Sequence, residues 1–251
     1  MCHGVSRLWC VLVPVTSPPS KRSDRIAGMF DAIAPRYDLL NRVLSAGLDR
    51  RWRRRAIQSL GLTRQTVLLD VCSGTADVPL EARRSEGLGM VIGVDFARAM
   101  LKVGSKKIQR AGLQAGIGLV QADATRLPVR TASVDAVTVA FGIRNVERPN
   151  EACLEMARTL KSGGRLAILE FGVPRIPGIS TLYLWYFRFL LPRVGRFVSG
   201  HQGAYAYLPA SVITFPAPEA FCEILATAGF TRVSAVPLSL GIVYLYTAQR
   251  A

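Results

Sequence analysis

Apolar residues between Gly61 and the C-terminus occur in short continuous runs, separated by stretches in which apolar and polar positions follow helical periodicity. Each run is bounded by turn-forming residues, which is typical of strands buried inside a sheet. The runs lie at residues 66–71, 90–95, 117–121, 134–141 and 165–171, and the helical stretches at residues 77–84, 97–109 and 150–160. Strands that alternate with helices over short connections predict a mainly parallel sheet covered on both faces.

The C-terminal end of the chain departs from this alternation. After a helical stretch at residues 218–228, apolar runs at residues 231–236 and 242–247 are separated only by residues 237–241. So short a link cannot hold a crossover helix, and the two runs must therefore pair antiparallel or lie in different places. We expect an α/β fold with a mainly parallel seven-stranded sheet and an antiparallel C-terminal strand.

The chain before the sheet is predicted to be helical. Apolar residues recur at helical spacing over residues 26–59, and Pro35 and Gly47 interrupt the pattern, which predicts two or three short helices. Residues 1–24 hold a short apolar run and a linker, and we expect a disordered extension there. Residues 25–251 are expected to form a single domain. Its parts are N-terminal helices (25–60), a core (61–171), an insertion (172–217) and a C-terminal helix with a strand pair (218–251).

The expected insertion contains a helical stretch, residues 182–191, that is apolar on nearly every side. Leu182, Trp185 and Phe189 share one face, and Leu184 lies on the other. A helix of this kind is either buried or faces something other than water, and this one is too short to span a bilayer. Two interpretations are open: a hydrophobic lid that touches a membrane surface, or simple core packing.

The chain is strongly basic. Thirty-two Lys and Arg residues against 17 Asp and Glu residues give a net charge of +15 and a pI near 10.4. This predicts an anionic partner, either nucleic acid or lipid. Residues 21–55 carry +6 and residues 171–218 carry +4 with no acid, so most of the excess lies outside the sheet-forming core. The five cysteines are odd in number and form no C-x-x-C pair, which predicts reduced thiols in a cytosolic protein and no metal site.

Acidic residues follow three consecutive predicted strands. Ligands of open parallel sheets bind beyond the carboxyl ends of the strands. There Asp70 would reach a cationic group, and Gly74 would let the backbone approach the ligand. Asp95 would accept both ribose hydroxyls of an adenosine ligand, Asp123 the adenine amino group, and the amide of Ala124 would pair with a ring nitrogen. The first turn lacks the pyrophosphate-binding glycines, and a sulfonium needs carboxylates, so S-adenosylmethionine is favoured over a dinucleotide.

Three sequence blocks make the interpretation more specific. They are YDLLNRVLSAGLDRRW at residues 37–52, AFGIRNV at residues 140–146, and RTLKSGGR at residues 158–165, which continues to Leu169-Glu170-Phe171. Together they resemble the signatures of the ubiquinone/menaquinone biosynthesis C-methyltransferase family, and the resemblance runs from about residue 29 to residue 249. It implies a Rossmann-like class I S-adenosylmethionine-dependent methyltransferase fold.

The resemblance also implies a cofactor site. The methyl donor S-adenosylmethionine would contact Thr75, Asp95, Asp123 and Ala124 and lie beside Ala140. Three positions differ from the residues that the family usually has. Ala76 stands for a glycine, which keeps backbone approach plausible unless φ must be positive. The family often has a serine where this chain has Ala140, so one cofactor contact through a hydroxyl is lost. The family often has a histidine where this chain has Asp49, which puts a role for histidine at that position in doubt.

The implied reaction is methylation of a ring carbon of a reduced polyprenyl quinone. A hydroquinone hydroxyl loses its proton, and the adjacent carbon attacks the sulfonium methyl in line. Arg144 and Asn145 are the candidate residues that orient and polarise the hydroxyl, through a water held with a nearby carboxylate, since an arginine is not a proton acceptor at neutral pH. A structural salt bridge is the alternative for Arg144. Tyr37 would line the same pocket or be buried in a helix.

Demethylmenaquinol, converted to menaquinol, is the preferred substrate, and 2-polyprenyl-6-methoxy-1,4-benzoquinol of ubiquinone biosynthesis is second. A hypothesis of another class is a non-catalytic cofactor- or quinone-binding subunit of a biosynthetic complex. A third hypothesis, a basic RNA methyltransferase, is motivated by the arginines at residues 50–55. Against it, no N-P-P-Y-type loop follows the fourth strand, and one solvated helix face with Trp52 turned inward also explains the arginines.

Charge and insertion together favour lipid over nucleic acid as the anionic partner. The two most basic segments are those expected to cover the substrate, and one of them holds the aromatic insertion. We therefore expect a cytoplasmic protein peripherally associated with the inner face of the cytoplasmic membrane, a polyprenyl quinol as substrate and no nucleic acid partner. The sequence leaves homodimer formation open.

Overall fold

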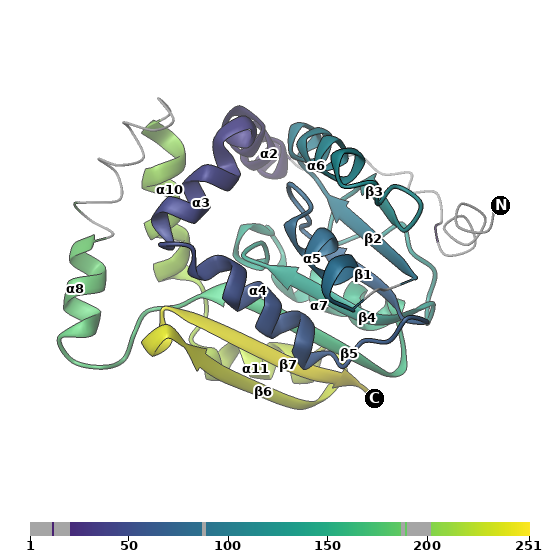
Figure 1. The fold of residues 1–251 in the computed structure, drawn as a ribbon. Coiled ribbons are helices and arrows are strands. Elements are labelled where there is room, and N and C mark those ends of the chain that lie inside the picture. Colours follow the sequence, from purple (N-terminus) through teal and green to yellow (C-terminus); the bar gives the residue numbers. More distant parts are fainter. Residues whose placement is uncertain (1–11, 13–20, 87–88, 187–188, 190–201) are drawn as a thin grey trace.

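The computed structural model describes residues 12, 21–86, 89–186, 189 and 202–251. Its centre is a sheet of seven strands in the order β3-β2-β1-β4-β5-β7-β6 (Figure 1). The strands are β1 (Val67–Val71), β2 (Met90–Asp95), β3 (Ile117–Gln121), β4 (Val134–Ala140), β5 (Leu160–Phe171), β6 (Phe230–Leu238) and β7 (Val243–Arg250). The first five are parallel, and β7 runs antiparallel to both β5 and β6. The predicted α/β fold, with its antiparallel C-terminal strand, is confirmed.

Strand β5 begins five residues earlier than the apolar run at residues 165–171 indicates. Its first part pairs with β4 at Leu160, and the register then shifts before Arg165. The shift passes through Gly163, whose φ is +73°, and Gly164, where a Cβ atom would lie 2.8 Å from the Lys161 carbonyl oxygen. The two glycines therefore allow an irregular strand where the polar sequence predicts a loop.

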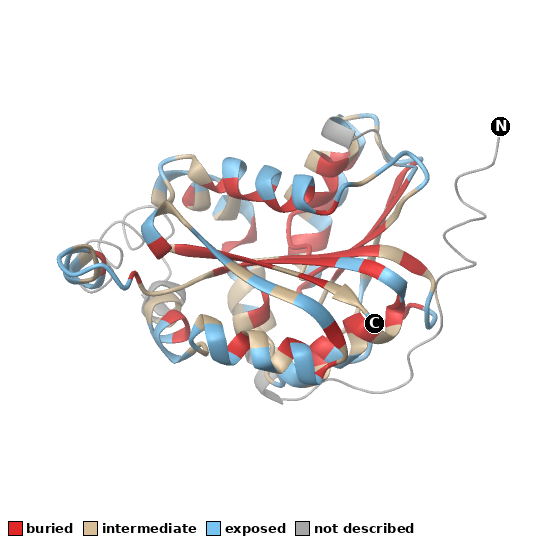
Figure 2. Ribbon diagram, turned by 90° about the horizontal axis from the view of Figure 1, so that it is seen from below, coloured by how far each residue is buried: buried red, intermediate tan, exposed pale blue. Residues whose placement is uncertain are grey.

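Helices cover both faces of the sheet, as the alternating pattern predicts (Figure 2). On one face lie α4 (Leu48–Ser59), α5 (Asp77–Glu86) and α6 (Arg98–Arg110); on the other lie α7 (Pro149–Thr159) and α11 (Pro218–Thr227). Successive strand residues point to opposite faces. Leu68 accordingly packs with Ile57 of α4, and Leu69 with Met156 of α7.

The N-terminal segment forms α2 (Lys21–Ile33), a 3-10 turn η1 (Ala34–Arg36), α3 (Tyr37–Leu44) and then α4. The breaks fall at Pro35 and at Gly47, where φ is +78°, so the prediction of two or three short helices is confirmed. Two helices of the insertion, α8 (Ile179–Trp185) and α10 (Gln202–Thr214), lie at the same end of the molecule as α3 (Figure 1). Ile33, Leu40, Tyr183 and Val212 form a small separate core there.

Most of the expected N-terminal extension lies outside the described residues. Leu12 is described and forms an isolated bridge with Val129, and α2 begins at Lys21, four residues before the expected start of the domain. Residues 187, 188, 190 and 191 of the apolar stretch predicted at residues 182–191 are also outside the described part. Among the residues that are described, no helix combines the length and the apolar character needed to cross a membrane.

Candidate active site

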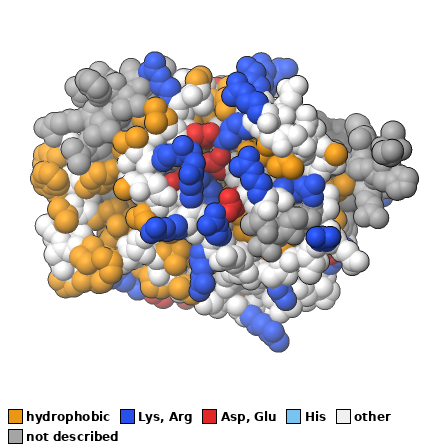
Figure 3. All heavy atoms as spheres, in the orientation of Figure 1, with side chains coloured by type: hydrophobic (Ala, Val, Ile, Leu, Met, Phe, Trp, Pro, Cys, Tyr) orange, Lys and Arg blue, Asp and Glu red, His pale blue; other side chains and the backbone are white. Residues whose placement is uncertain are grey.

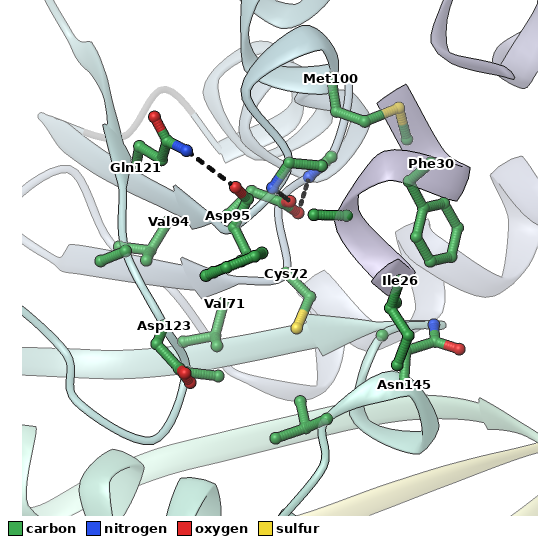
Figure 4. Close-up of a pocket in the computed structure, with 18 of the residues that line it drawn as sticks. Ile26, Phe30, Val71, Cys72, Val94, Asp95, Met100, Gln121, Asp123 and Asn145 are labelled. Carbon is green, nitrogen blue, oxygen red and sulfur yellow. Dashed lines mark hydrogen bonds between the residues drawn. The ribbon is translucent and has the colours of Figure 1, made fainter. Parts of the chain in front are cut away.

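A cavity of about 740 Å³ lies at the carboxyl ends of the parallel strands (Figure 4). Its walls come from the ends of β1 to β4, from the turns that follow them, and from α2, which closes one side. This is where an open parallel sheet binds its ligands, because the loops after adjacent strands diverge there and leave a crevice. The predicted site residues that line the cavity are Tyr37, Gly74, Asp95, Asp123, Ala124, Ala140 and Asn145.

Asp95 is held rigidly at the end of β2. Its carboxylate accepts hydrogen bonds from the backbone amides of Gly74 at 2.7 Å and Ala97 at 2.8 Å. Burial raises the pKa of this carboxyl to about 6, and the amide bonds offset part of that increase. Gly74 has a φ of +54°, so the turn that brings its amide to Asp95 uses a conformation that favours glycine. The turn after β1 and the acid after β2 thus form one unit.

Two predicted cofactor residues do not line this cavity. Asp70 is 1% exposed and accepts a hydrogen bond from the Thr138 hydroxyl on β4 at 2.7 Å. Burial raises the pKa of Asp70 to about 7. The Thr75 hydroxyl donates to Asp38 of α3 at 2.5 Å, away from the cavity. Contacts of these two side chains with a cofactor therefore remain predictions, and the structure gives both of them other partners.

Ala76 has a φ of +63°, so the position does require the left-handed region where the family usually has glycine. An L-residue there costs about 1–2 kcal/mol. Its methyl group is fully buried and faces α6, where a Cβ atom on Gly104 would lie 3.1 Å from it. The side chain is therefore accommodated between β1 and α6 and does not project into the cavity.

The pattern of apolar residues did not identify α2 as part of the site. Ile26 and Phe30 line the cavity, and Phe30 packs edge-on against Tyr37 with ring centroids 6.2 Å apart. Asp31 on the same helix accepts a hydrogen bond from the backbone amide of Ala99, at the start of α6. Helical spacing predicts the helix and its apolar face, but it does not tell whether that face covers a core or a cavity.

A second cavity, of about 490 Å³, lies beside the first. Phe30, Tyr37 and Phe141 line both of them. The second cavity is mostly apolar, with walls from α3, α4 and α8. Among the described residues that line it, only Asp49, Arg53 and Arg144 are charged. The cavity at the strand ends is the more polar of the two and is called the polar compartment below; the one under the N-terminal helices is called the apolar compartment.

Three aromatic rings form one wall of the apolar compartment. The Phe141 and Phe171 ring centroids lie 4.6 Å apart, and Trp52 packs edge-on against both, at 6.0 and 6.4 Å. Phe141 has a φ of +61°, directly after β4. A bulky residue in the left-handed region is uncommon and is found where the surrounding structure holds it in place, often at functional sites. This position puts Phe141 between the two cavities.

Arg144 and Asn145 follow Phe141 in a short 3-10 turn, η2 (Ile143–Asn145), and face different compartments. Arg144 lines the apolar cavity, and Asn145 the polar one. The Arg144 guanidinium forms an ion pair with the fully buried Glu170 at 2.5 Å, donates to the Phe141 carbonyl at 2.6 Å, and lies 5.2 Å from the Phe171 ring centroid. The structural salt bridge, given above as the alternative for Arg144, is therefore present, and Arg144 also lines the cavity; its role toward the quinol hydroxyl stays a prediction.

Two polar atoms beside the cavities have no hydrogen-bond partner within the part of the chain that the structure describes. They are Nε of Arg144 and Oδ1 of Asn145. Tyr37 lines both cavities, and burial raises the pKa of its phenol, an effect that a hydrogen bond with Asn41 and the charges of Arg144 and Arg53 partly offset. Unpartnered buried polar atoms at a cavity wall are the groups that a bound ligand would satisfy.

The arginines of α4 are divided between surface and interior. Arg50, Arg51, Arg54 and Arg55 are exposed, and Trp52 is buried, so the interpretation as a solvated helix face is supported (Figure 3). Arg53 was not expected to be buried. It is 7% exposed and forms ion pairs with Asp49 at 2.5 Å and Asp77 at 3.1 Å. Within the described residues, no cluster of three or more His, Cys, Asp or Glu side chains could hold a metal ion.

Comparison with protein families finds a match over nearly the whole chain. A model of the ubiE/COQ5 methyltransferase family matches residues 19–250. The ubiquinone/menaquinone biosynthesis C-methyltransferase UbiE of Geobacter sp. (strain M21) is 41% identical over 92% of this chain and 98% of the relative. The demethylmenaquinone methyltransferase of Bacteroides fragilis (strain ATCC 25285) is 38% identical over 93% of this chain and 96% of the relative.

Solved structures with lower sequence identity share the fold. The cyclase SpnF superimposes with a TM-score of 0.70 at 17% identity and covers 94% of this chain and 99% of its own. A phosphoethanolamine N-methyltransferase 2 of Haemonchus contortus, solved in complex with S-adenosyl-L-methionine, gives a TM-score of 0.59 at 14% identity, over 80% of this chain and 52% of its own. The first of these structures is named a cyclase and the second a methyltransferase, so the shared fold does not by itself give the activity, which has to be argued from the site.

Proposed function

Because the chain belongs to the ubiE/COQ5 methyltransferase family, we propose that it methylates a ring carbon of a reduced polyprenyl quinone. S-adenosylmethionine is the methyl donor and supplies an electrophilic methyl group on a sulfonium. Demethylmenaquinol is the preferred acceptor, as for the Bacteroides fragilis relative. The second candidate acceptor is 2-polyprenyl-6-methoxy-1,4-benzoquinol, because the Geobacter relative is named for both quinones.

The polar cavity fits the donor. Its volume of about 740 Å³ suits a nucleoside-sized molecule, and acids follow two of the strands that border it. Asp95 would hold the ribose, and Asp123, in the turn after β3, would hold the adenine amino group. The backbone at Gly74 would lie against the methionine part, because a residue without a side chain permits close approach there.

The apolar cavity fits the acceptor, and this arrangement is the observation that carries the proposal. A quinol ring with a prenyl tail needs apolar walls and few polar groups, and the described lining has only three charged side chains. Phe141 lies between the two cavities, so a methyl group would pass from one compartment to the other beside it. Holding both reactants in line at this junction, away from water, supplies much of the rate enhancement.

Arg144 would stabilise the oxyanion that forms when the quinol hydroxyl loses its proton. Its positive charge is fixed by Glu170 and by the Phe141 carbonyl, and its Nε atom is free of other hydrogen bonds among the described residues. Preorganised hydrogen-bond donors that point at developing negative charge stabilise the transition state and contribute much of the rate enhancement. Asn145 would orient the same hydroxyl or a water bound to it. The proton leaves to a base other than Arg144, since a guanidinium does not accept protons at neutral pH.

One experiment separates the three hypotheses. The protein is incubated with S-adenosylmethionine labelled in its methyl group and with reduced demethylmenaquinone, the reduced benzoquinol, or total RNA. We expect transfer to a quinol and none to RNA. Cofactor binding without transfer to either quinol would contradict the proposal and favour a non-catalytic binding subunit, and transfer to RNA would favour the third hypothesis.

Two variants test the assigned roles. Asp95→Ala is expected to abolish cofactor binding, because it removes the acceptor of the ribose hydroxyls. Arg144→Ala is expected to leave cofactor binding within about threefold and to lower kcat by about 10²-fold or more. Equal loss of cofactor binding in both variants would show that Arg144 acts only as a structural ion pair.

We further propose that the end of the molecule formed by α3, α8 and α10 contacts an anionic membrane surface. Large apolar side chains are exposed there: Leu39, Val43, Leu182, Leu184, Trp185 and Ile213. The exposed arginines of α4 lie beside this apolar end (Figure 3). Apolar side chains flanked by cations are typical of proteins that lie on anionic lipid, and a lipid surface is where a prenylated quinol resides. This supports a peripheral location on the inner face of the cytoplasmic membrane.

Binding to vesicles tests the membrane proposal. We expect salt-sensitive binding to vesicles that contain anionic lipid, and a marked loss when Trp185 and Phe189 are both replaced by serine. The matched control replaces Leu154 and Val236, two exposed apolar residues on α7 and β6, by serine. Undiminished binding of the Trp185 and Phe189 variant, in a protein that still binds S-adenosylmethionine, would exclude this end as the contact.

A further inference from the structure

Asp49 is an unusual group for the wall of an apolar cavity. It lies in the first turn of α4, is 6% exposed, and lines the second cavity together with Arg53 and Arg144. Its carboxylate accepts hydrogen bonds at both oxygens, from the Ser45 hydroxyl at 2.9 Å and from Arg53 at 2.5 Å. Each oxygen of a carboxylate has two lone pairs, so both can accept one more hydrogen bond.

The two ionic pairs of this cavity differ in what they can offer a ligand. Arg144, paired with Glu170, only donates hydrogen bonds; Asp49, paired with Arg53, only accepts them. Arg53 is shared between Asp49 and Asp77, and Asp77 lines neither of the two cavities described above. Tyr37 lines the same cavity as Asp49, Arg53 and Arg144. The cavity therefore has a donor-only group and an acceptor-only group.

A hydroquinone that is about to be methylated offers the complementary pair, one hydrogen-bond acceptor and one donor. The oxygen beside the attacked carbon has lost its proton and is an acceptor, while the oxygen across the ring keeps its proton and is a donor. The oxidised quinone differs, because both of its oxygens are carbonyls that only accept. A carbonyl that faces a carboxylate has no proton to share, so both groups lose hydrogen bonds on burial.

We infer that Asp49 accepts a hydrogen bond from the quinol hydroxyl that keeps its proton, and that it thereby selects the reduced substrate over the oxidised quinone. The inference rests on the proposed function and adds a specificity residue to it. A ligand that places its oxyanion at Arg144 and its hydroxyl at Asp49 satisfies both groups at once. The oxidised quinone can satisfy only Arg144, so we expect it to bind roughly 30-fold more weakly.

The test is direct binding of both redox forms. Protein saturated with S-adenosylhomocysteine, which prevents turnover, is titrated without oxygen with a short-chain demethylmenaquinone, either reduced or oxidised. Quenching of tryptophan fluorescence reports occupancy, because Trp52 lines the cavity. We expect the natural protein to prefer the reduced form by roughly 30-fold. In Asp49→Asn the preference should fall to within about threefold, because an amide both donates and accepts.

Asp77→Asn is the matched control, since it removes the other carboxylate from Arg53 without changing the cavity wall. We expect it to keep the preference for the reduced form. Equal loss of preference in Asp77→Asn would show that the effect acts through the position of Arg53 and would overturn the inference. An unchanged preference in Asp49→Asn would overturn it as well.

A modified ligand keeps the inference testable if Asp49→Asn does not fold. The mono-O-methyl ether that blocks the hydroxyl away from the methylated carbon cannot donate to Asp49, and we expect it to bind the natural protein roughly 30-fold more weakly than the free quinol. Equal binding of ether, quinol and quinone, together with normal methyl transfer, would refute the inference alone. Absence of transfer to any quinol would refute the proposed function instead.

Discussion

If Asp95 holds the ribose as proposed, it connects the pH of the solution to cofactor binding. Its pKa is raised to about 6 because the carboxyl is buried, and only the ionised form can accept hydrogen bonds from both ribose hydroxyls. We expect the Kd for S-adenosylmethionine to be constant above pH 7 and to rise by up to tenfold per pH unit below about pH 6. Isothermal titration between pH 5 and 8 measures this. Asp95→Asn should bind weakly at every pH, and a pH dependence that persists in this variant would assign the effect to another group.

Asp70 should influence stability. The folded protein holds a proton on this carboxyl up to about pH 7, whereas its ordinary pKa is 3.8. Since the folded state binds the proton more tightly, the free energy of unfolding falls as the pH rises from about 4 to 7, and the destabilisation is complete above pH 7. Asp70→Asn stays neutral and keeps an acceptor for Thr138. We expect it to be more stable than the natural protein by about 1–3 kcal/mol at pH 8 and by much less at pH 5.

Thermal unfolding at several pH values measures the difference. Parallel stability curves for the two proteins would show that Asp70 is not the titrating group. The same variant also tests the predicted contact between Asp70 and the cofactor. A large loss of S-adenosylmethionine affinity in Asp70→Asn would support that contact although the carboxyl does not line the cavity.

At the scale of single residues, the sequence identifies positions better than side-chain directions. Gly74, Asp95 and Asp123 line the predicted cavity because a strand end fixes where its turn lies. Asp70 comes one residue before the end of β1, on the same side of the sheet as Leu68, and pairs with Thr138 on the adjacent β4. Which residue stands across the strand depends on sheet register, and one sequence does not give that register.

The N-terminal helices are attached to the core by a group of ion pairs around Lys107 of α6. Its ammonium group contacts Asp38 of α3 at 2.6 Å and also Asp77 of α5. Asp38 in turn accepts a hydrogen bond from the Thr75 hydroxyl, next to Gly74 in the turn after β1. Three helices and the turn after β1 therefore meet at one cation.

Lys107→Met tests how much this group contributes. The substitution leaves two carboxylates close together without their shared cation, and we expect a loss of about 2 kcal/mol in the free energy of unfolding. Urea unfolding measures it, and Lys106→Met, an exposed lysine on the same helix, is the control that should change stability by less than about 0.5 kcal/mol. Equal effects of the two substitutions would mean that the ion pairs add nothing.

At the scale of elements, the apolar pattern located all seven strands, but it placed the start of β5 too late, because two glycines there allow an irregular strand. The early start of β5 depends on Gly163 and Gly164, whose polar neighbours indicate a loop. The role of α2 as a cavity wall was also missed. Its apolar face is like that of any packed helix, and only the three-dimensional structure shows that the face covers a cavity.

Across the whole molecule, the positive charge is concentrated in a way that the net charge of +15 does not describe. Four exposed arginines lie on one helix beside the apolar end formed by α3, α8 and α10. Arg50→Gln with Arg51→Gln should lower binding to anionic vesicles by about 30-fold at low salt, at about 1 kcal/mol per residue. Binding to neutral vesicles should not change, and vesicle sedimentation measures both.

The control for this pair carries the same loss of charge elsewhere. Arg110→Gln with Arg130→Gln removes two exposed arginines, one on α6 and one in the loop before β4, and should change vesicle binding little. If both double variants lose binding equally, the overall charge of the molecule matters and its placement on α4 does not.

The helices that cover both cavities come first in the chain, yet some of their contacts are with residues made much later. Trp52 donates to the hydroxyl of Ser239, 187 positions further on, and Tyr186 donates to the carbonyl of Leu44. A ribosome therefore releases this cover long before some of the residues that hold it exist. During synthesis the segment translated first therefore cannot complete its contacts until the last strands of the sheet have been made.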